Sequence, residues 1–379
     1  MKRPSLGKVV RPKLTRLKLP KSLQPLRIGF LPENDCAPLV VAQEFGCFKK
    51  YRLEVELHSQ ASWKHIHDQI LHGHLEAAQA PATLPFLISL GLTPEKAQCV
   101  TGLVLSLQGN GLTVSRELRR LGVHDAASMR ERLWTDRNRK IYTFATTCPL
   151  SPQYALLCQW LKSAKVPPYT EVRIESVPPE QMFPLLKLGY LDGYCAGEPW
   201  TSVAQQSGFG TCIATSATLA PLHPEKVLMV RKDFADNRAE EHERLIAALL
   251  EACHLCERAE NQPTICRLLA QPRFVNAPSE CLEPGIQGPF GPEDAQIPSL
   301  YGGNIFYRGR ANEPTAAKAA WLTGRLFSFL RWETRPRALD GVFRPDIFRH
   351  AQRFLPKEFS KQIQTDTLEN LRPSVQAGV

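Results

Sequence analysis

The stretch that decides the fold is 176-SVPPEQMFPLLKLGYLDGYCAGEPW-200, followed by HPEKV at 223–227. Residues 179–188 have the apolar spacing of a short helix, and Gly189 is placed to end it. The apolar run 191–196 then predicts a buried strand. A helix followed by a strand at this spacing predicts an α/β fold, in which ligands bind where strands end and loops begin.

The two motifs GYLDGYCAGEPW and HPEKV resemble the nitrate-binding family of periplasmic-binding-protein-like chains. ANEPTAAKAAW at 311–321 and FRPDIFRHAQRFLPKE at 343–358 extend the resemblance, which runs from Leu26 to about Glu358. That family includes binding subunits of nitrate and bicarbonate ABC transporters and a cytoplasmic nitrate/nitrite sensor. The resemblance implies a type II periplasmic-binding-protein fold, with two α/β lobes and a ligand cleft between them.

The expected organisation follows from this order of elements. We expect a basic leader (1–25), a first lobe (26–115), a second lobe (116–226), a return to the first lobe with C-terminal helices (227–358), and a tail (359–379). The polar segment 117–139 is expected to be an irregular crossover, and the Pro- and Gly-rich segment 271–303 is expected to be irregular too. Asn34-Asp35 is expected to cap the helix that begins at Ala37.

The net charge of +10 is concentrated at one end of the chain. Residues 1–27 carry nine Lys or Arg and no acid, which leaves +10 − 9 = +1 for the rest. We therefore expect no direct nucleic-acid binding outside the leader, which is either solvated or contacts an anionic partner such as RNA.

The leader lacks the apolar core of a secretory signal, and no apolar run reaches the ~20 residues of a membrane span. An odd number of cysteines, eleven, fits a reducing compartment, so we expect a cytoplasmic protein.

The sequence predicts neither a cofactor nor a metal site. Cys253-His254-Leu255-Cys256 has CxxC spacing, but no second pair follows it. His65 and His72 share a helix face without a carboxylate or cysteine beside them. No Cys/His or Ser/His arrangement for catalysis is readable, so we do not expect an enzyme. A thiamine-precursor type of enzyme on the same fold is the alternative.

A site for nitrate needs one cation, several neutral donors and a flat wall. The candidate ligand-binding residues are Lys226 as the cation; Gln79, Gln108, Asn110 and Gln153 as donors; Ser151 at a helix start; Trp63 as the wall; and Glu198. By resemblance, Trp63, Gln153 and Lys226 match ligand positions of the family, although the family often has His where Gln153 stands. For Glu198 we favour a structural role in the turn, since a carboxylate would repel an anion.

The resemblance implies a function in the cytoplasm. We expect a nitrate/nitrite sensor whose cleft closure controls a regulatory partner, an RNA-binding antiterminator. The alternative is the substrate-binding subunit of a nitrate or bicarbonate ABC transporter; family members that bind bicarbonate use a metal. The sequence does not rank nitrate, nitrite and bicarbonate. A Lys226→Ala change is expected to abolish the response to the anion and to leave the fold intact.

Overall fold

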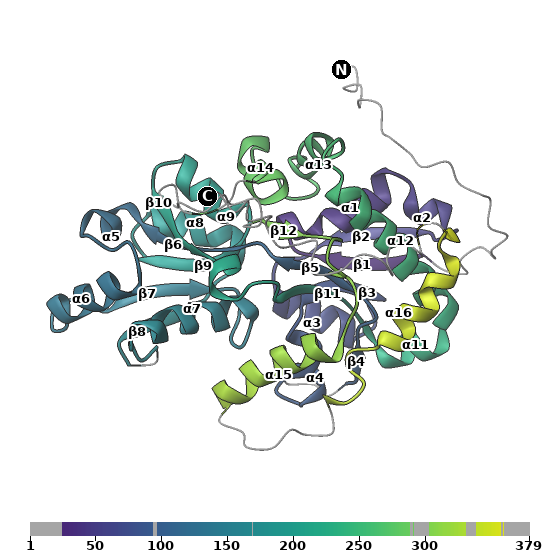
Figure 1. Ribbon diagram of the computed structural model, residues 1–379, viewed down its shortest axis with the longest axis horizontal. Coiled ribbons are helices and arrows are strands. Elements are labelled where there is room, and N and C mark those ends of the chain that lie inside the picture. The colour runs from purple at the N-terminus through teal and green to yellow at the C-terminus, as the bar shows by residue number, and fades with distance from the viewer. Residues whose placement is uncertain are drawn as a thin grey trace, which may run out of the picture.

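The structure is a computed structural model, and it describes residues 25–93, 97–168, 170–288, 291, 303–330, 339–357 and 359. Its two β-sheets lie side by side along the long axis, each flanked by helices (Figure 1). The predicted leader and tail lie outside the described residues, apart from Pro25 and Phe359. The two mixed α/β sheets are those of a type II periplasmic-binding-protein fold, as predicted.

Lobe 1 is built on a seven-stranded sheet in the order β12-β5-β11-β3-β1-β2, with β4 paired to β11. Its strands are β1 (Leu26–Phe30), β2 (Val55–Ser59), β3 (Ala77–Pro81), β4 (Cys99–Val100), β5 (Val104–Gln108), β11 (Pro224–Arg231) and β12 (Asn304–Ile305). Strand β1 pairs in parallel with β2 and β3, whereas β11 runs antiparallel to β3 and β5. The carboxyl ends of β1 and β3 and the amino end of β11 therefore meet at one edge of the sheet.

Helices cover both faces of this sheet. They are η1 (Asn34–Cys36), α1 (Ala37–Glu44), α2 (Cys47–Lys50), α3 (Trp63–Leu71), α4 (Leu84–Ser89), α11 (Lys232–Asn237), α12 (Ala239–Glu257), α13 (Gln262–Leu269), α14 (Ser279–Gln287), α15 (Ala316–Leu330), α16 (Pro345–Ala351) and η3 (Gln352–Phe354). The long helix α12 packs against α1 and contributes much of the lobe 1 core. Cys253 and Cys256 are buried apolar residues of that core, with free thiols.

Lobe 2 is built on a five-stranded sheet in the order β10-β6-β9-β7-β8. Its elements are β6 (Asn110–Ser115), α5 (Arg116–Arg120), α6 (Ala126–Asp136), β7 (Tyr142–Thr146), α7 (Pro152–Ser163), β8 (Val172–Ser176), α8 (Pro179–Lys187), β9 (Gly193–Gly197), α9 (Trp200–Gln206), β10 (Gly210–Thr215) and α10 (Ser216–Leu219). Parallel pairs join β7 to β8 and to β9, and β6 runs antiparallel to β9 and β10.

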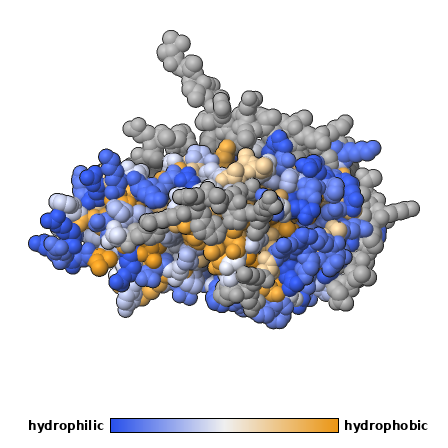
Figure 2. All heavy atoms as spheres, turned by 90° about the horizontal axis from the view of Figure 1, so that it is seen from below, coloured by the Kyte–Doolittle hydropathy of each residue, from blue (hydrophilic) through white to orange (hydrophobic). Residues whose placement is uncertain are grey.

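The chain crosses between the lobes twice. Strand β5 ends in lobe 1 at Gln108 and β6 begins in lobe 2 at Asn110, with Gly109 between them at a positive φ of 85°. The chain returns between β10 and β11, whereas the sequence placed these two boundaries at 115/116 and 226/227. On the face seen in Figure 2, hydrophilic residues gather at both ends of the molecule, and hydrophobic residues are more frequent toward the middle.

Two predicted irregular segments contain helices. The segment 117–139 holds most of α5 and all of α6, and α6 begins with a capping box in which Asp125 and Ser128 bond each other's backbone. Apolar residues of α6 pack into the lobe 2 core, so burial stabilises a segment that looks polar in sequence. Helix α14 lies within 271–303 despite an internal proline. The expectation of irregular structure was wrong in both places.

Candidate functional site

The candidate site lies where the two sheets meet. Strand β1 is followed by Glu33 and Asp35, and β11 begins with Pro224, Glu225 and Lys226. Lobe 2 contributes the first residue of β6, Asn110, and the first turn of α7. Strand ends at a point where the chain changes sheets are the usual ligand position in open α/β folds. The carboxyl, ammonium and amide groups gathered there are buried from solvent.

Lys226 is surrounded by carboxylates. Its Nζ atom lies 2.7 Å from Asp35 Oδ2, 2.9 Å from Glu225 Oε1 and 3.3 Å from Glu33 Oε2, and its side chain has 0% exposure. Burial by itself would lower the pKa of Lys226, but the three carboxylates outweigh burial and hold that pKa well above its usual range. The ammonium therefore stays charged, and it is the cation of this buried cluster.

The three carboxyl groups are not equivalent. Burial would raise the pKa of Glu225, but Lys226 and His223 outweigh burial and lower it to about 2. His223 Nε2 lies 2.9 Å from Glu225 Oε2. Burial raises the pKa of Asp35, and it raises the pKa of Glu33 to about 8 against the pull of Lys226. At neutral pH, Glu225 is therefore firmly ionised, whereas Glu33 is largely protonated.

Amide side chains of lobe 2 bond the carboxylate of Glu225 in lobe 1. Asn110 Nδ2 donates to Glu225 Oε2 at 2.6 Å, and Gln153 Nε2 donates to Glu225 Oε1 at 2.6 Å. Gln153 Nε2 also lies 2.9 Å from Asn110 Oδ1. Hydrogen bonds to an ionised acceptor are each worth roughly 1.5–3 kcal/mol. These bonds hold the two lobes together at the cluster, so the structure is that of a closed cleft.

Two further predicted residues complete the lobe 1 side. Gln79 Oε1 accepts from the Leu31 backbone N–H at 3.1 Å, and Gln79 Nε2 donates to Asp35. The ring centroid of Trp63 lies 5.3 Å from Lys226 Nζ, within the range of a cation–π interaction. Trp63 is 3% exposed, and its Nε1 has no hydrogen-bond partner among the described residues. Both residues therefore lie in the cluster.

Three predicted residues bond protein groups outside the Lys226 cluster. Gln108 lies at the crossover with φ 59°, and its Oε1 accepts from the Leu222 backbone N–H at 2.7 Å. Ser151 caps α7 by accepting from the Tyr154 N–H at 3.1 Å. Glu198 accepts hydrogen bonds from the N–H and the hydroxyl of Ser202. Burial raises the pKa of Glu198 to about 8. These contacts join Glu198 to the start of α9, and the structural role that the sequence favours for Glu198 stays a prediction.

The candidate ligand-binding residues predicted from the sequence did not include four members of this cluster: Glu33, Asp35, His223 and Glu225. Asp35 was expected to help cap the helix at Ala37, but α1 has no side-chain cap and Asp35 bonds Lys226 instead. Their position in the sequence could have indicated that Glu33 and Asp35 belong to the site, because both residues follow the carboxyl end of a parallel strand, where ligands usually bind.

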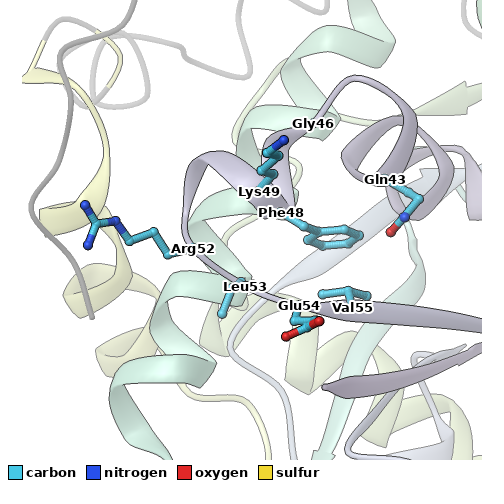
Figure 3. Close-up of a pocket in the computed structure, with 8 residues that line it drawn as sticks. All are labelled: Gln43, Gly46, Phe48, Lys49, Arg52, Leu53, Glu54 and Val55. Carbon is cyan, nitrogen blue, oxygen red and sulfur yellow. The ribbon is translucent and has the colours of Figure 1, made fainter. Parts of the chain in front are cut away.

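Two surface cavities lie away from this cluster. One, of about 620 Å³, lies beside α2 and the start of β2 and is lined by Gln43, Gly46, Phe48, Lys49, Arg52, Leu53, Glu54 and Val55 (Figure 3). The other, of about 1090 Å³, lies between α6 and the end of α7. Neither cavity is lined by a residue of the Lys226 cluster.

Within the described ranges, no group of three or more His, Cys, Asp or Glu has an arrangement that could hold a metal ion. No helix of the described part of the chain has the length and apolarity needed to cross a membrane.

The fold and the buried interlobe site together define a two-lobe binding protein of the periplasmic-binding-protein class. Sequence comparison places the chain more closely: it belongs to the NMT1-like family, which it matches over residues 20–270. The resemblance to nitrate-binding chains is confirmed by a solved structure, that of the periplasmic nitrate-binding protein NrtA from Synechocystis PCC 6803. This structure superposes with a TM-score of 0.83 and 25% identity, covering 90% of this chain and 91% of NrtA.

Curated relatives include transport proteins for two different anions. The nitrate import ATP-binding protein NrtC of Synechocystis is 35% identical over 341 residues, covering 87% of this chain and 50% of the relative. The bicarbonate-binding protein CmpA of Synechococcus elongatus is 25% identical over 354 residues, covering 87% of this chain and 78% of the relative. The chain thus spans about half the length of the ATP-binding relatives that it matches.

Proposed function

We propose that this chain binds a small oxyanion, of the nitrate, nitrite or bicarbonate class, in the cleft between its lobes and serves an ABC-type import system. The observation that carries the proposal is Lys226, a fully buried ammonium at the lobe junction, beside the face of Trp63 and the amides of lobe 2. The named functions of the relatives, nitrate import and bicarbonate binding, support the same ligand class.

The ligand would bind between groups of both lobes. Lys226 supplies the charge from lobe 1, while Asn110 and Gln153 supply N–H donors from lobe 2. An anion that takes hydrogen bonds from both sides binds the closed form better than the open form, because only closure brings its donors together. Three or four such bonds suffice for micromolar binding after the cost of association.

The charge of the cluster bears on the choice of oxyanion. With Asp35 and Glu225 ionised beside Lys226, the cluster carries −2 + 1 = −1, and ionisation of Glu33 above about pH 8 makes it −2. Nitrate and nitrite can only accept hydrogen bonds, whereas the hydroxyl of bicarbonate can also donate to a carboxylate. The acidic surroundings of Lys226 therefore favour an oxyanion that carries a hydrogen, and bicarbonate is the leading candidate.

Import is favoured over the cytoplasmic sensor because two of the relatives are named for nitrate import and for bicarbonate transport. An RNA-binding antiterminator partner and a cytoplasmic location stay predictions from the sequence resemblance, as does the absence of an enzymatic activity. A regulatory partner would be recognised by co-purification that depends on the anion, and this remains the direct test of the sensor alternative.

Calorimetric titration with nitrate, nitrite and bicarbonate tests the proposal, with calcium added or withheld. We expect saturable binding of at least one anion, weakened in Gln153→Ala because a donor from lobe 2 is lost. Gln159→Ala is a matched control, since Gln159 is an amide of the same helix that bonds the Leu219 carbonyl outside the cluster. Absence of binding by all three anions, or equal affinity in Gln153→Ala, would contradict the proposal.

A further inference from the structure

Glu33 is the least satisfied carboxyl group of the cluster. Its side chain has 0% exposure, and among the described residues neither oxygen has a hydrogen-bond partner besides the ammonium of Lys226. The nearest cationic atom, Lys226 Nζ, is 3.3 Å from Oε2, compared with 2.7 Å for Asp35 and 2.9 Å for Glu225. Asp35 also receives a bond from an amide, and Glu225 receives two from lobe 2. Glu33 alone is left with unused acceptor capacity.

The groups packed around Glu33 do little to balance its charge. Strand β11 presents Lys226 and Glu225, η1 presents Asp35 and the thiol of Cys36, and the end of β9 presents the backbone of Gly197. A Cβ atom on Gly197 would lie 2.6 Å from Glu33 Oε1, so the carboxyl group lies directly against lobe 2. His223 is one contact further away, bonded to Glu225. Lys226 is the single ammonium or guanidinium that contacts Glu33 in the described part of the chain.

Two unpartnered donors lie in the same region. Ser106 is directly opposite Lys226 in the β5–β11 ladder, so both side chains lie on one face of the sheet. Ser106 Oγ and Trp63 Nε1 are buried, and both lack hydrogen-bond partners within the described ranges. An oxyanion can accept from such donors, and one bound beside Lys226 would approach the Glu33 carboxyl group, which contacts the same ammonium. That contact is favourable only if a hydrogen lies between the two groups.

We propose that Glu33 is the specificity-determining residue of the cleft, and that it shares one hydrogen with the bound oxyanion. This inference rests on the proposed function. Bicarbonate brings the hydrogen on its own hydroxyl and donates it to the Glu33 carboxylate. Nitrate or nitrite brings none, so it binds together with a proton taken from solution, which forms an O–H bond on Glu33 that donates to the anion. Binding of these two anions is therefore linked to pH.

The pKa of the Glu33 carboxyl group agrees with its proposed role in sharing a hydrogen with the bound oxyanion. Burial raises the pKa of Glu33 to about 8, so the free protein in the closed form holds the hydrogen at neutral pH and loses it above about pH 8. Above that pH, nitrate binding must take up a proton, and its affinity falls about tenfold for each pH unit. Above that pH the affinity for bicarbonate does not fall in this way, whereas below it bicarbonate must displace the hydrogen of Glu33 and binds with release of a proton.

The test is calorimetry of the full chain in two buffers with different ionisation enthalpies, at about pH 9. The difference in observed enthalpy counts the protons taken up. We expect about one proton per bound nitrate and about none per bound bicarbonate. Glu33→Gln, which is permanently neutral and can donate, should bind nitrate without proton uptake and with an affinity that stays flat above about pH 8.

Glu180→Gln is the matched control, since burial also raises the pKa of this α8 carboxyl without a contribution from Lys226. It should leave proton uptake by the protein unchanged. Circular dichroism checks that both variants are folded. The proton count for the wild-type protein, taken from the two buffers, tests the proposal even if a variant fails to fold. Nitrate binding with no proton uptake in the wild type would overturn the role of Glu33 and leave the proposed function standing. Absence of binding by nitrate, nitrite and bicarbonate alike would overturn both.

Discussion

Replacing Lys226 by methionine tests the electrostatic account of the cluster. Methionine keeps most of the volume of the side chain but removes the charge that lies within 3.3 Å of three buried carboxyl groups. Removing one partner of a buried ion pair costs about 3–5 kcal/mol, because the remaining charge is left uncompensated. We therefore expect Lys226→Met to lower the free energy of unfolding by that amount near neutral pH. The structure thus revises the expectation that a substitution at Lys226 leaves the fold intact.

The loss should depend on pH in a defined direction. Without the ammonium, the folded-state pKa values of Asp35 and Glu33 rise further above their unfolded values. A carboxyl group with a raised pKa costs no stability below its unfolded pKa, about 4, and costs progressively more as the pH rises toward the folded pKa. The destabilisation by Lys226→Met should therefore be largest at about pH 8 and smaller at about pH 4.5, where part of it persists because Glu225, whose pKa Lys226 helps to lower to about 2, also loses its counter-ion.

Urea denaturation at those two pH values measures the effect. Combining Lys226→Met with Asp35→Asn should recover part of the loss, with a coupling energy of about 1–3 kcal/mol. Lys64→Met is the control, because Lys64 is 79% exposed in its ion pair with Asp68 and should have little effect. A loss below about 1 kcal/mol at pH 8, or a loss that does not change with pH, would refute the account of Lys226 as the buried counter-ion.

Three further changes probe the same cluster. Glu33→Gln should stabilise the protein by a few kcal/mol at about pH 8 and leave its stability unchanged near pH 4.5, because the pKa of Glu33 in the wild type is raised from 4.5 to about 8. Urea denaturation at both pH values measures this difference, and a stability gain that is the same at the two pH values would contradict it. Gln153→Ala removes a 2.6 Å bond to Glu225 and should weaken oxyanion affinity about 10- to 100-fold by calorimetry, with an unchanged affinity as the contrary result. Gly197→Ala would place a Cβ 2.6 Å from Glu33 Oε1 and should cost about 1–3 kcal/mol of stability in thermal unfolding; wild-type stability would show that the two lobes are less closely packed there.

The sequence predicted the fold class because local patterns and topology agree. Apolar periodicity was enough to predict the strand that begins at Leu26. A terminating glycine marked the end of the helix that follows this strand, and a capping serine marked the start of the helix at Pro152. Helices α5 and α6 were missed because their sequence is mostly polar. Their stability comes from burial of a few residues, such as Met129, against distant strands, and periodicity over so short a segment did not reveal it.

For the site, the sequence by itself determined the residue types. It supplied a lysine after a glutamate at the start of a strand, one amide at the crossover between the lobes, a second amide at the start of one helix, and a tryptophan at the start of another helix. Only the tertiary structure decided which of them meet. It placed Glu33 and Asp35, almost two hundred residues from Lys226 in the chain, within 3.3 Å of its ammonium. It also showed that the side chains of Gln108, Ser151 and Glu198 accept from the backbone N–H groups of Leu222, Tyr154 and Ser202, respectively. The reason is physical: buried charge is tolerated only where opposite charges converge, and that convergence depends on how two sheets are joined.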